Sequence, residues 1–428
     1  MVKDKHIISE LNGFFHKNDC NKAVNSIMTT IRHLHLRSSC IGIEKRHNCK
    51  LSCLQVLELL LVFPFFMVKN SFQYHHSGLS KLFSCQKDMF YRFMEQDNID
   101  WRKLVYMVSL RLLKRISSRK DSKESLQCLI IDDTDLPKTG FKTEMIGRIY
   151  SHVLHKSILG FKGLFLCHTD GKTQTMLDFS LHGEEGKNPE KKQGLTDKQR
   201  KARFNKKRDG DSAVNTRVKE YRQSKIDRSI EMVREAIRKG IRFDYLLVDS
   251  WFTCADLLNF ICSRHLKCHL IGMMKMGKTR YKTRFGNLNA SGIIERLKKE
   301  KSVKYSRKLN CHYAYIDAEY VNRKIRIFFC KRGRKGTWNA FLSTNIGLDF
   351  FEAYRIYSMR WAIEVCFSEM KGLLKLGKCQ CRNFSSQIAS VSLTMIQYNI
   401  LSFIKRFETY ETIGEQFAKP STEQWNCP

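Results

Sequence analysis

The stretch from Asp349 to Leu376 reads DFFEAYRIYSMRWAIEVCFSEMKGLLKL. It contains no proline, and its single glycine, Gly372, lies near its end, so the pattern predicts one helix of several turns. At about 100° per residue, four polar side chains of this helix fall within an arc of roughly 60°: Tyr357, Arg360, Glu364 and Lys371. An aromatic ring, a guanidinium, a carboxylate and an ammonium therefore share one narrow face. The residues that meet this face have to come from elsewhere in the chain.

The overall charge indicates a polyanionic partner. The 428 residues include 76 Lys and Arg against 42 Asp and Glu, a formal net charge of +34. Such an excess is typical of proteins that bind nucleic acid, and an anionic membrane surface is the main alternative. The apolar run Val56–Val68 contains Glu58 and is shorter than the about 20 residues that cross a bilayer. With no signal-peptide pattern and with scattered cysteines, the sequence predicts a cytoplasmic protein with reduced thiols and no membrane contact.

Residues 1–120 are predicted to be helical. The apolar run Leu51–Phe63 predicts a buried helix that Pro64 ends. Two short helices around a turn are expected over residues 78–94, and Ser84 is the expected cap of the second helix. Because this pattern resembles a helix-turn-helix, the region is a candidate DNA-binding domain; an ordinary helical bundle has the same pattern.

Two apolar strands are each predicted to end in a carboxylate. The run Leu126–Ile131 is followed by Asp132 and Asp133, and Phe243–Val248 is followed by Asp249. Ligand sites in open α/β sheets gather at the carboxyl ends of strands, so these aspartates are candidate metal ligands. An aspartate at the end of a strand is also a common turn residue, which is the ordinary structural alternative.

The remaining segments have distinct patterns. Gly160–His168 and Thr173–Leu181 predict a hairpin, because an Asp-Gly turn separates them. Residues 187–225 carry 14 basic and 5 acidic residues, which predicts a solvated loop that lies on DNA phosphates. Residues 276–347 are predicted to be rich in strands, and Ser385–Phe407 predicts a final apolar helix.

The acidic residues form a set without histidine or cysteine partners. One carboxylate from each of the two strand ends and Glu364 from the polar helix face make three. Three carboxylates suit a hard cation such as Mg²⁺, or Mn²⁺ in its place. Two such ions can activate a water or hydroxyl and stabilise the leaving oxygen of a phosphodiester. The alternative for Glu364 is an i,i+4 ion pair with Arg360.

Residues Tyr357, Arg360, Glu364 and Lys371 follow one another with two, three and six residues between them. This spacing matches the Y-R-E-K signature of a group of bacterial insertion-sequence transposases. The stretches IIDDTDLPKTG and YLLVDSWF also resemble the two aspartate motifs of these DDE enzymes. The resemblance covers roughly Ser125 to Phe407 and implies an RNase H-like catalytic core.

The resemblance implies a DDE triad of Asp133, Asp249 and Glu364 that binds Mg²⁺ or Mn²⁺. Asp132 is the rival for the first position. Asp133 is preferred because the carboxylate of the family precedes a threonine, which is Thr134 in this sequence.

The same resemblance implies that Tyr357, Arg360 and Lys371 hold DNA phosphates near the cut end. In relatives that cut through a hairpin intermediate, an aromatic residue of the β-rich insertion stacks on a flipped base. Trp338 is the candidate for that residue here, and a Trp buried in the core is the alternative.

The predicted fold is α/β: an RNase H-like mixed sheet flanked by helices, interrupted by a β-rich insertion, with an N-terminal helical domain. The predicted divisions are 1–120 (helical, DNA-binding), 121–275 (first part of the core, with the basic loop 183–225), 276–347 (β-rich insertion), 348–410 (C-terminal helices of the core) and 411–428 (polar tail).

The predicted function is that of a DNA transposase that cleaves DNA at insertion-sequence ends and joins it to target DNA. Its expected partners are double-stranded DNA, as terminal inverted repeats and target, and a second copy of the chain in the DNA complex. The expected location is the bacterial cytoplasm, associated with the nucleoid. The alternatives are a catalytically inactive DNA-binding derivative and an RNase H-like nuclease without strand transfer. An aspartyl phosphatase fits less well, because Pro137 stands where that motif needs Thr or Val.

Overall fold

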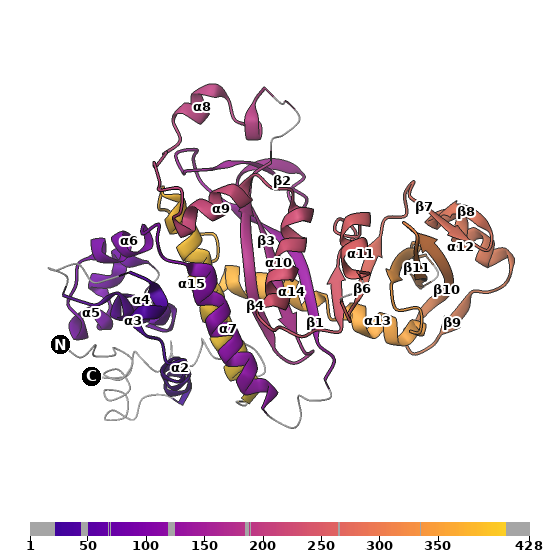
Figure 1. Ribbon diagram of the computed structural model, residues 1–428, viewed down its shortest axis with the longest axis horizontal. Helices are drawn as coiled ribbons and strands as arrows, with labels where there is room; N and C mark the ends of the chain where they lie inside the picture. The colour runs from indigo at the N-terminus through magenta and orange to yellow at the C-terminus, as the bar shows by residue number, and fades with distance from the viewer. Residues whose placement is uncertain are drawn as a thin grey trace.

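The structure is a computed structural model and is drawn in Figure 1. It describes residues 22–43, 50–66, 68, 70–118, 125–184, 188, 190–263, 266–333 and 335–407. The tail predicted over 411–428 lies outside the described residues.

The helices of the described chain are α2 (Lys22–His33), α3 (Ser38–Ile41), α4 (Cys53–Val62), α5 (Gly78–Leu82), α6 (Lys87–Met94), α7 (Trp101–Ser117), α8 (Asp197–Lys201), α9 (Ala213–Tyr221), α10 (Lys225–Arg238), α11 (Ala255–Ile261), α12 (Ala290–Lys299), α13 (Phe350–Ser358), α14 (Trp361–Gly372) and α15 (Phe384–Phe407), with 3₁₀ turns η1 (Phe63–Phe66), η2 (Ser71–His76) and η4 (Lys192–Gly194). The strands are β1 (Cys128–Pro137), β2 (Gly147–Ser151), β3 (Lys156–Thr169), β4 (Gln174–His182), β5 (Tyr245–Val248), β6 (His269–Met274), β7 (Arg280–Thr283), β8 (Gly286–Asn289), β9 (Lys304–Ser306), β10 (Cys311–Tyr320), β11 (Arg323–Arg332) and β12 (Asn339–Ser343).

The order and direction of the strands define the fold of the core sheet. Five strands lie in the order β4-β3-β1-β5-β6. Strands β4, β3 and β1 pair antiparallel, whereas β5 and β6 run parallel to β1. This arrangement, with α10 crossing from β4 to β5, is that of an RNase H-like core. The predicted fold class is confirmed, including the hairpin of β3 and β4.

The β-rich insertion extends the core sheet. Strand β12 pairs with β6, and the sheet continues through β11, β10, β7 and β8. The insertion also contains the helix α12, which the strand-like sequence pattern did not predict. The domain boundaries drawn from the sequence remain predictions, since packing is continuous across residue 120, where α7 lies against α15.

Each face of the core sheet is covered by different helices (Figure 1). Ile130 of β1 and Leu247 of β5 pack in one hydrophobic cluster with α14 and α15. Their neighbours Ile131 and Val248 pack in a second cluster with α10 and α11. Successive strand residues thus face opposite layers, as the pleat requires.

The edge of the sheet at β4 is closed by α15. Asn399 of this buried helix accepts a hydrogen bond from the Met176 N–H (2.7 Å) and donates one to the Met176 carbonyl (2.8 Å). Ser402 accepts another from the N–H of Gln174 (3.1 Å). An unpaired strand edge is costly when buried, and these polar side chains satisfy it. The predicted apolar helix is confirmed, and its polar residues serve the sheet edge.

The prediction of one unbroken helix over 349–376 is wrong. The chain forms α13 and α14, separated at Met359 and Arg360. The amides of Met359 and Arg360 bond to carbonyls three residues earlier, so the turn is tighter than an α-helix. The sequence has no proline or glycine at this point to indicate the break.

The region around α4 to α6 follows the sequence closely, with one exception. The buried helix α4 ends where Pro64 begins a 3₁₀ turn, and the two short helices α5 and α6 are present. The predicted cap Ser84 is wrong, because the residue at that position of α6 is Gln86. None of the helices in the described residues has both the length and the apolar character needed to cross a membrane.

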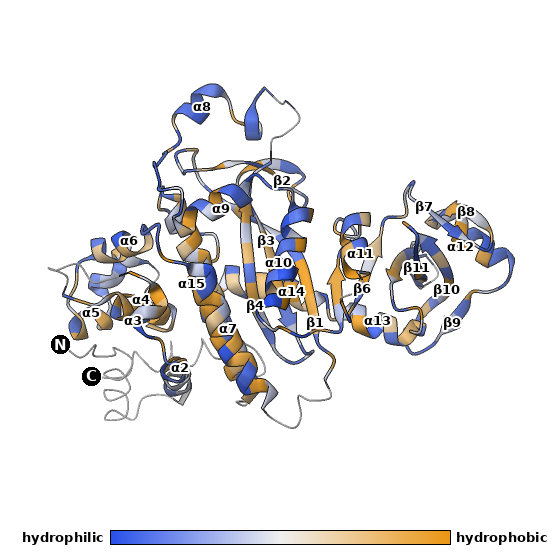
Figure 2. Cartoon of the chain, in the orientation of Figure 1, coloured by the Kyte–Doolittle hydropathy of each residue, from blue (hydrophilic) through white to orange (hydrophobic). Residues whose placement is uncertain are grey.

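The basic segment 187–225 is more ordered than its composition predicts. It includes α8 and α9, and Figure 2 shows α8 as hydrophilic. Arg208 forms a two-pronged pair with Glu144 (2.5 and 2.6 Å) and also donates to Asp97 (3.1 Å). Arg217 is buried. The segment is therefore anchored to the core by part of its own charge, and the prediction of a fully solvated loop is wrong.

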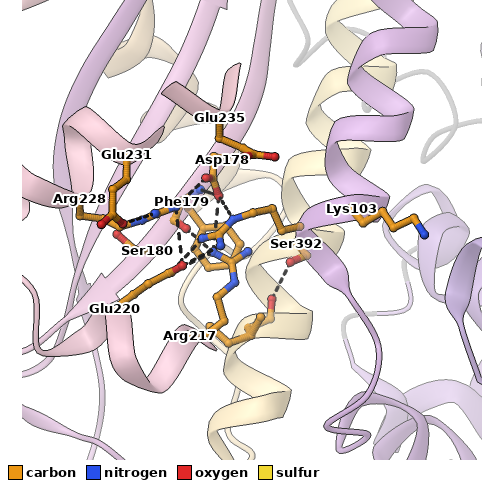
Figure 3. Close-up of polar contacts among 12 residues, drawn as sticks. Lys103, Asp178, Phe179, Ser180, Arg217, Glu220, Arg228, Glu231, Glu235 and Ser392 are labelled. Atoms are coloured by element: carbon orange, nitrogen blue, oxygen red, sulfur yellow. Dashed lines mark hydrogen bonds and ion pairs between the residues drawn. The ribbon is translucent and has the colours of Figure 1, made fainter. Parts of the chain in front are cut away.

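A buried ion network joins this segment to three other elements (Figure 3). Asp178 of β4 pairs with Arg102 of α7 (2.9 Å), Arg228 of α10 (2.8 Å) and Arg217 of α9 (3.4 Å). Glu220 takes a further bond from Arg102 (2.6 Å). Burial alone would raise the pKa of Asp178, but the arginines outweigh it and hold the pKa below its usual value.

Replacement of Asp178 by Asn is expected to lower the free energy of unfolding by about 3–5 kcal/mol, because three guanidinium groups each lose one of their carboxylate partners and Glu220 is the buried carboxylate that they still share. Urea denaturation of the purified protein measures this change. Glu295→Gln, which removes an exposed pair with Lys298, is the control and should change stability by less than about 1 kcal/mol. An Asp178→Asn protein as stable as wild type would contradict the account of the network.

Candidate active site

Strand β1 continues through its acidic residues. The sequence predicts a strand that stops at Ile131, but β1 runs to Pro137. Asp132 pairs in register with Phe165 and Asp133 with Leu164, so both aspartates lie inside the ladder with β3. Side chains within a strand alternate, so the two neighbouring carboxylates point to opposite faces of the sheet.

Asp132 lies on the face covered by α14. Its Oδ2 accepts a hydrogen bond from Arg360 Nη1 at 2.9 Å. Arg360 Nη2 also donates to Glu364 Oε1, so one guanidinium joins the two carboxylates. The i,i+4 pair that the spacing allowed is present, and it is part of a three-residue bridge from β1 to α14.

Asp249 lies directly after β5, the parallel neighbour of β1. Its Oδ1 accepts hydrogen bonds from the backbone N–H groups of Trp251 (2.9 Å) and Phe252 (3.2 Å), which fixes the loop that follows the strand. Tyr357 extends its hydroxyl to the Val248 carbonyl at 3.4 Å and stacks on Phe341 with ring centroids 5.5 Å apart.

Lys371 continues the polar row along β1. Its ammonium donates to Thr134 Oγ1 at 2.7 Å, and Thr134 lies on the same sheet face as Asp132. The four residues predicted to share a face therefore all lie along the ends of β1 and β5, although they come from α13, from α14 and from the junction between them: Tyr357, Arg360, Glu364 and Lys371.

Asp133 belongs to a different group on the α10 face. Its Oδ2 accepts a hydrogen bond from Lys225 at 2.6 Å, and Lys162 lies 4.0 Å from its Oδ1. Lys225 also lies over the ring of Trp251, 4.0 Å from its centroid. The structure thus brings Asp132, and not the preferred Asp133, to Glu364.

The pKa of Asp132 differs from that of an ordinary surface carboxylate. Burial raises the pKa of Asp132 to about 7, with Asp249 adding to the rise and Arg360 opposing it. Burial likewise raises the pKa of Tyr357 to about 12 and lowers the pKa of Lys371. A buried carboxylate with a raised pKa beside a second carboxylate marks a candidate functional site.

The donor set fits a hard divalent cation. Asp132, Asp249 and Glu364 offer carboxylate oxygens only, which Mg²⁺ and Mn²⁺ prefer. The Arg360 guanidinium now lies between two of these carboxylates, where positive charge is needed. Within the described ranges, no three His, Cys, Asp or Glu side chains lie close enough to form a metal site as they stand. The guanidinium of Arg360 occupies oxygens of Asp132 and Glu364 that a cation would need.

A cavity of about 480 Å³ opens beside the polar row. Its lining includes Tyr357, Arg360, Phe341 and Trp361, and Trp361 is 62% exposed. The predicted base-stacking residue Trp338 does not line this cavity. It packs against the second hydrophobic cluster, with a lysine ammonium 5.7 Å from its ring centroid.

Sequence reasoning missed Lys225, Trp251 and Trp361 as residues near the site. Lys225 begins α10, and only the fold brings it to β1. Trp251 stands two residues after Asp249 in the quoted motif, so its position was a signal that could have been used.

Comparisons with known proteins give one family match. Residues 79–281 match the model of a family described as DDE superfamily endonuclease. The match includes Asp132, Asp133 and Asp249 and ends before Glu364. Among curated proteins, none matches the sequence.

Two solved structures are similar at low identity. One is described as a cryo-EM structure of the piggyBac transposase synaptic complex with hairpin DNA, at 11% identity and a TM-score of 0.47, covering 94% of this chain and 82% of the other. The other is the NurA nuclease from Sulfolobus solfataricus, at 9% identity and a TM-score of 0.25, covering 79% of this chain and 97% of the other. With TM-scores below 0.5, neither supports an argument about this chain.

Replacement of Asp132 by Asn is expected to stabilise the metal-free protein at high pH. Because the folded-state pKa lies above the unfolded value, wild-type stability falls as pH rises from about 4 to about 7. Asn does not ionise, so the variant does not lose stability in this way. Its free energy of unfolding should exceed that of wild type by on the order of 1–4 kcal/mol at pH 8, and by less at pH 5. Thermal melts in EDTA at the two pH values measure it.

Asp133→Asn is the matched control for that experiment. It removes the partner of Lys225 and should not become more stable than wild type at pH 8. If Asp132→Asn is no more stable than wild type at pH 8, or if its gain in stability is larger at pH 5, Asp132 does not have the raised pKa described above.

Proposed function

We propose that this protein is a DNA transposase of the DDE type, with Asp132, Asp249 and Glu364 as its catalytic carboxylates. The observation that carries the proposal is the convergence of Asp132 and Glu364 on one guanidinium, beside Asp249 at the end of the neighbouring parallel strand. The family match over the segment with both aspartates and the charge of +34 support it.

The proposed reaction has two phosphoryl-transfer steps. Water attacks a phosphodiester at the end of the element, the bond from phosphorus to the 3′ oxygen breaks, and the strand is left with a 3′-OH. This hydroxyl then attacks a phosphodiester of target DNA, which joins the strands and releases a new 3′-OH. A homodimer that holds two element ends would carry out both steps on each.

The carboxylates would hold Mg²⁺ or Mn²⁺. When bound, such ions supply Lewis-acid stabilisation of the phosphodiester oxygens and lower the pKa of a water nucleophile. Since Asp132 has a pKa of about 7, its proton has to leave before the oxygen can act as a ligand. Arg360, freed from its carboxylates, can then turn its planar donors to a DNA phosphate.

The neighbouring polar residues would position the DNA strand. Lys371 lies along β1 from Arg360 and offers a second positive charge. Tyr357 contributes a hydroxyl and a ring next to the 480 Å³ cavity. Trp338 remains a proposed base contact only if the insertion rearranges on DNA, because its ring packs against the core of the insertion.

Two other functions would fit a protein of this fold. An RNase H-like nuclease would cleave and not join, and the description of the matched family names cleavage alone. A strand-transfer assay with precleaved ends distinguishes it from a transposase. A catalytically inactive DNA-binding derivative would bind DNA without any Mg²⁺-dependent cleavage.

Cleavage assays on the DNA that flanks the coding region test the proposal. Asp132→Asn, Asp249→Asn and Glu364→Gln should each lower the Mg²⁺-dependent cleavage rate by at least about 100-fold. Asp133→Asn, a matched neutral change at the next position, should leave the rate within about tenfold of wild type.

Equal cleavage by wild type and the three triad variants would overturn the proposal. If Asp133→Asn were inactive and Asp132→Asn active, the enzyme class would stand and the assignment of the first carboxylate would be wrong.

Salt dependence should show which basic residues meet DNA. Several lysines of the basic segment are exposed, among them Lys198, Lys201 and Lys207. Each phosphate contact that Ala removes should flatten the slope of log K against log salt by about 0.9. Lys239→Ala, at the residue that caps the C-terminus of α10 and pairs with Glu235, is the control. Unchanged slopes for the three lysines would show that the segment does not lie on phosphates.

A further inference from the structure

The hairpin of β2 and β3 ends in exposed apolar side chains. Its turn lies between Ser151 and Lys156, which pair at the end of the ladder. Val153 is 86% exposed, Leu154 is 55% exposed, and Tyr150 at the start of the turn is 41% exposed. Most large apolar side chains of the described chain are buried, so three at one tip need an explanation.

The tip is held in a defined conformation. The Leu154 N–H donates to Ser151 Oγ at 3.3 Å, and the Tyr150 ring packs edge-on against His152, with centroids 5.2 Å apart. The Tyr150 N–H donates to Glu184 at 2.6 Å. These bonds hold the backbone of the turn, so less of the chain has to be ordered when its exposed side chains enter a partner.

The base of the hairpin is tied to the catalytic strand. Lys162 is buried and donates to the Tyr150 carbonyl at 3.0 Å and to Asp135 of β1. Its ammonium is also 4.0 Å from Asp133. The position of the tip is therefore coupled to the strand that carries Asp132.

The hairpin extends past the carboxyl end of β1, the edge where the catalytic carboxylates lie. Pro137, the last residue of β1, pairs with Gly160, and β3 continues back to Lys156. In Figure 1, β2 lies at the end of the sheet where α8 is drawn. From Phe165, opposite Asp132, back to Lys156, a strand at about 3.3 Å per residue spans roughly 30 Å.

The surroundings of the tip favour DNA over a second copy of the chain. Lys156 is exposed beside the tip, Arg148 lies on β2, and Lys192 belongs to η4, which contacts β2. Glu184 is the carboxylate at the base of the hairpin. Even a whole buried aromatic side chain contributes only about 150–250 Å². Three partly exposed side chains therefore fall short of the about 800 Å² per partner of a standard protein interface.

We propose that Val153 and Leu154 form a wedge that inserts between base pairs of the DNA substrate and unstacks one step. This inference rests on the proposed function. Apolar side chains that enter DNA in this way kink the duplex, at a cost of a few kcal/mol per step. The span of β3 places the unstacked step about one helical turn, roughly 34 Å, from the phosphodiester at Asp132.

Permanganate footprinting tests the wedge, because permanganate oxidises thymines that are unstacked. The probe is a duplex with the DNA that flanks the coding region, bound in EDTA so that no cleavage occurs. Wild type should make a thymine about one helical turn from the cleavage position hyperreactive. The double variant Val153→Ser, Leu154→Ser should lower that reactivity at least about fivefold while binding and thermal stability change little.

Two variants serve as controls. Val321→Ser changes an exposed valine at the turn between β10 and β11, which is 38% exposed, and should leave the footprint unchanged. Leu154→Met keeps an apolar tip and should keep the hyperreactive thymine.

The outcomes separate the wedge from the proposed function. A double variant with the wild-type footprint, or a bound wild type without any hyperreactive thymine, overturns the wedge. Loss of a dimer in solution by the double variant would instead assign the tip to contact between copies and would also overturn it. If wild type shows the tip-dependent footprint and never cleaves with Mg²⁺, the wedge stands and the proposed function fails.

Discussion

The alternation of side chains along β1 is the constraint on which the candidate site depends. Because β1 continues past Ile131 to Pro137, Asp132 and Asp133 sit in the pleat and cannot face the same layer. Asp132 meets Arg360 and Glu364 on the α14 side, whereas Asp133 meets Lys225 on the α10 side. The strand thereby presents one carboxylate to the α14 side, where the proposed catalytic residues lie, and a second that pairs with Lys225 at the start of α10.

The resulting site holds a carboxylate with a raised pKa beside a guanidinium. Asp132 and Asp249 lie near the ends of two parallel strands, and burial together with the charge of Asp249 raises the pKa of Asp132 to about 7. Arg360 supplies partial compensation from the junction of α13 and α14. Several buried polar groups around the site have partners. The arginines pair with Asp178, and polar side chains of α15 bond to the backbone at the sheet edge. The scaffold thus keeps a buried carboxylate, Asp132, next to a second one, Asp249, which is a feature of candidate functional sites.

Much of this arrangement could be predicted from the sequence, and the reasons for the failures are physical. Apolar runs located β5 and α15, and the spacing from Tyr357 to Lys371 identified the polar face. The choice between Asp132 and Asp133 depends on where β1 ends, and a run of acidic residues does not show that it stays in a ladder with β3. The break at Met359 has no proline or glycine that would indicate it, and the residues around it contact distant parts of the chain, Asp132 of β1 and Phe341, which a local pattern does not show. The anchoring of Arg208 and Arg217 depends on distant partners, which composition does not reveal.

The position of bound manganese tests the central claim most directly. Crystals grown with Mn²⁺ and measured at its absorption edge give an anomalous map that locates the ion without assumptions about ligands. The account predicts a peak within about 2.0–2.6 Å of oxygens of Asp132 and Asp249, with the Arg360 side chain moved away from Asp132. A peak coordinated by Asp133, or crystals with Mn²⁺ bound elsewhere and Arg360 still on Asp132, would contradict it.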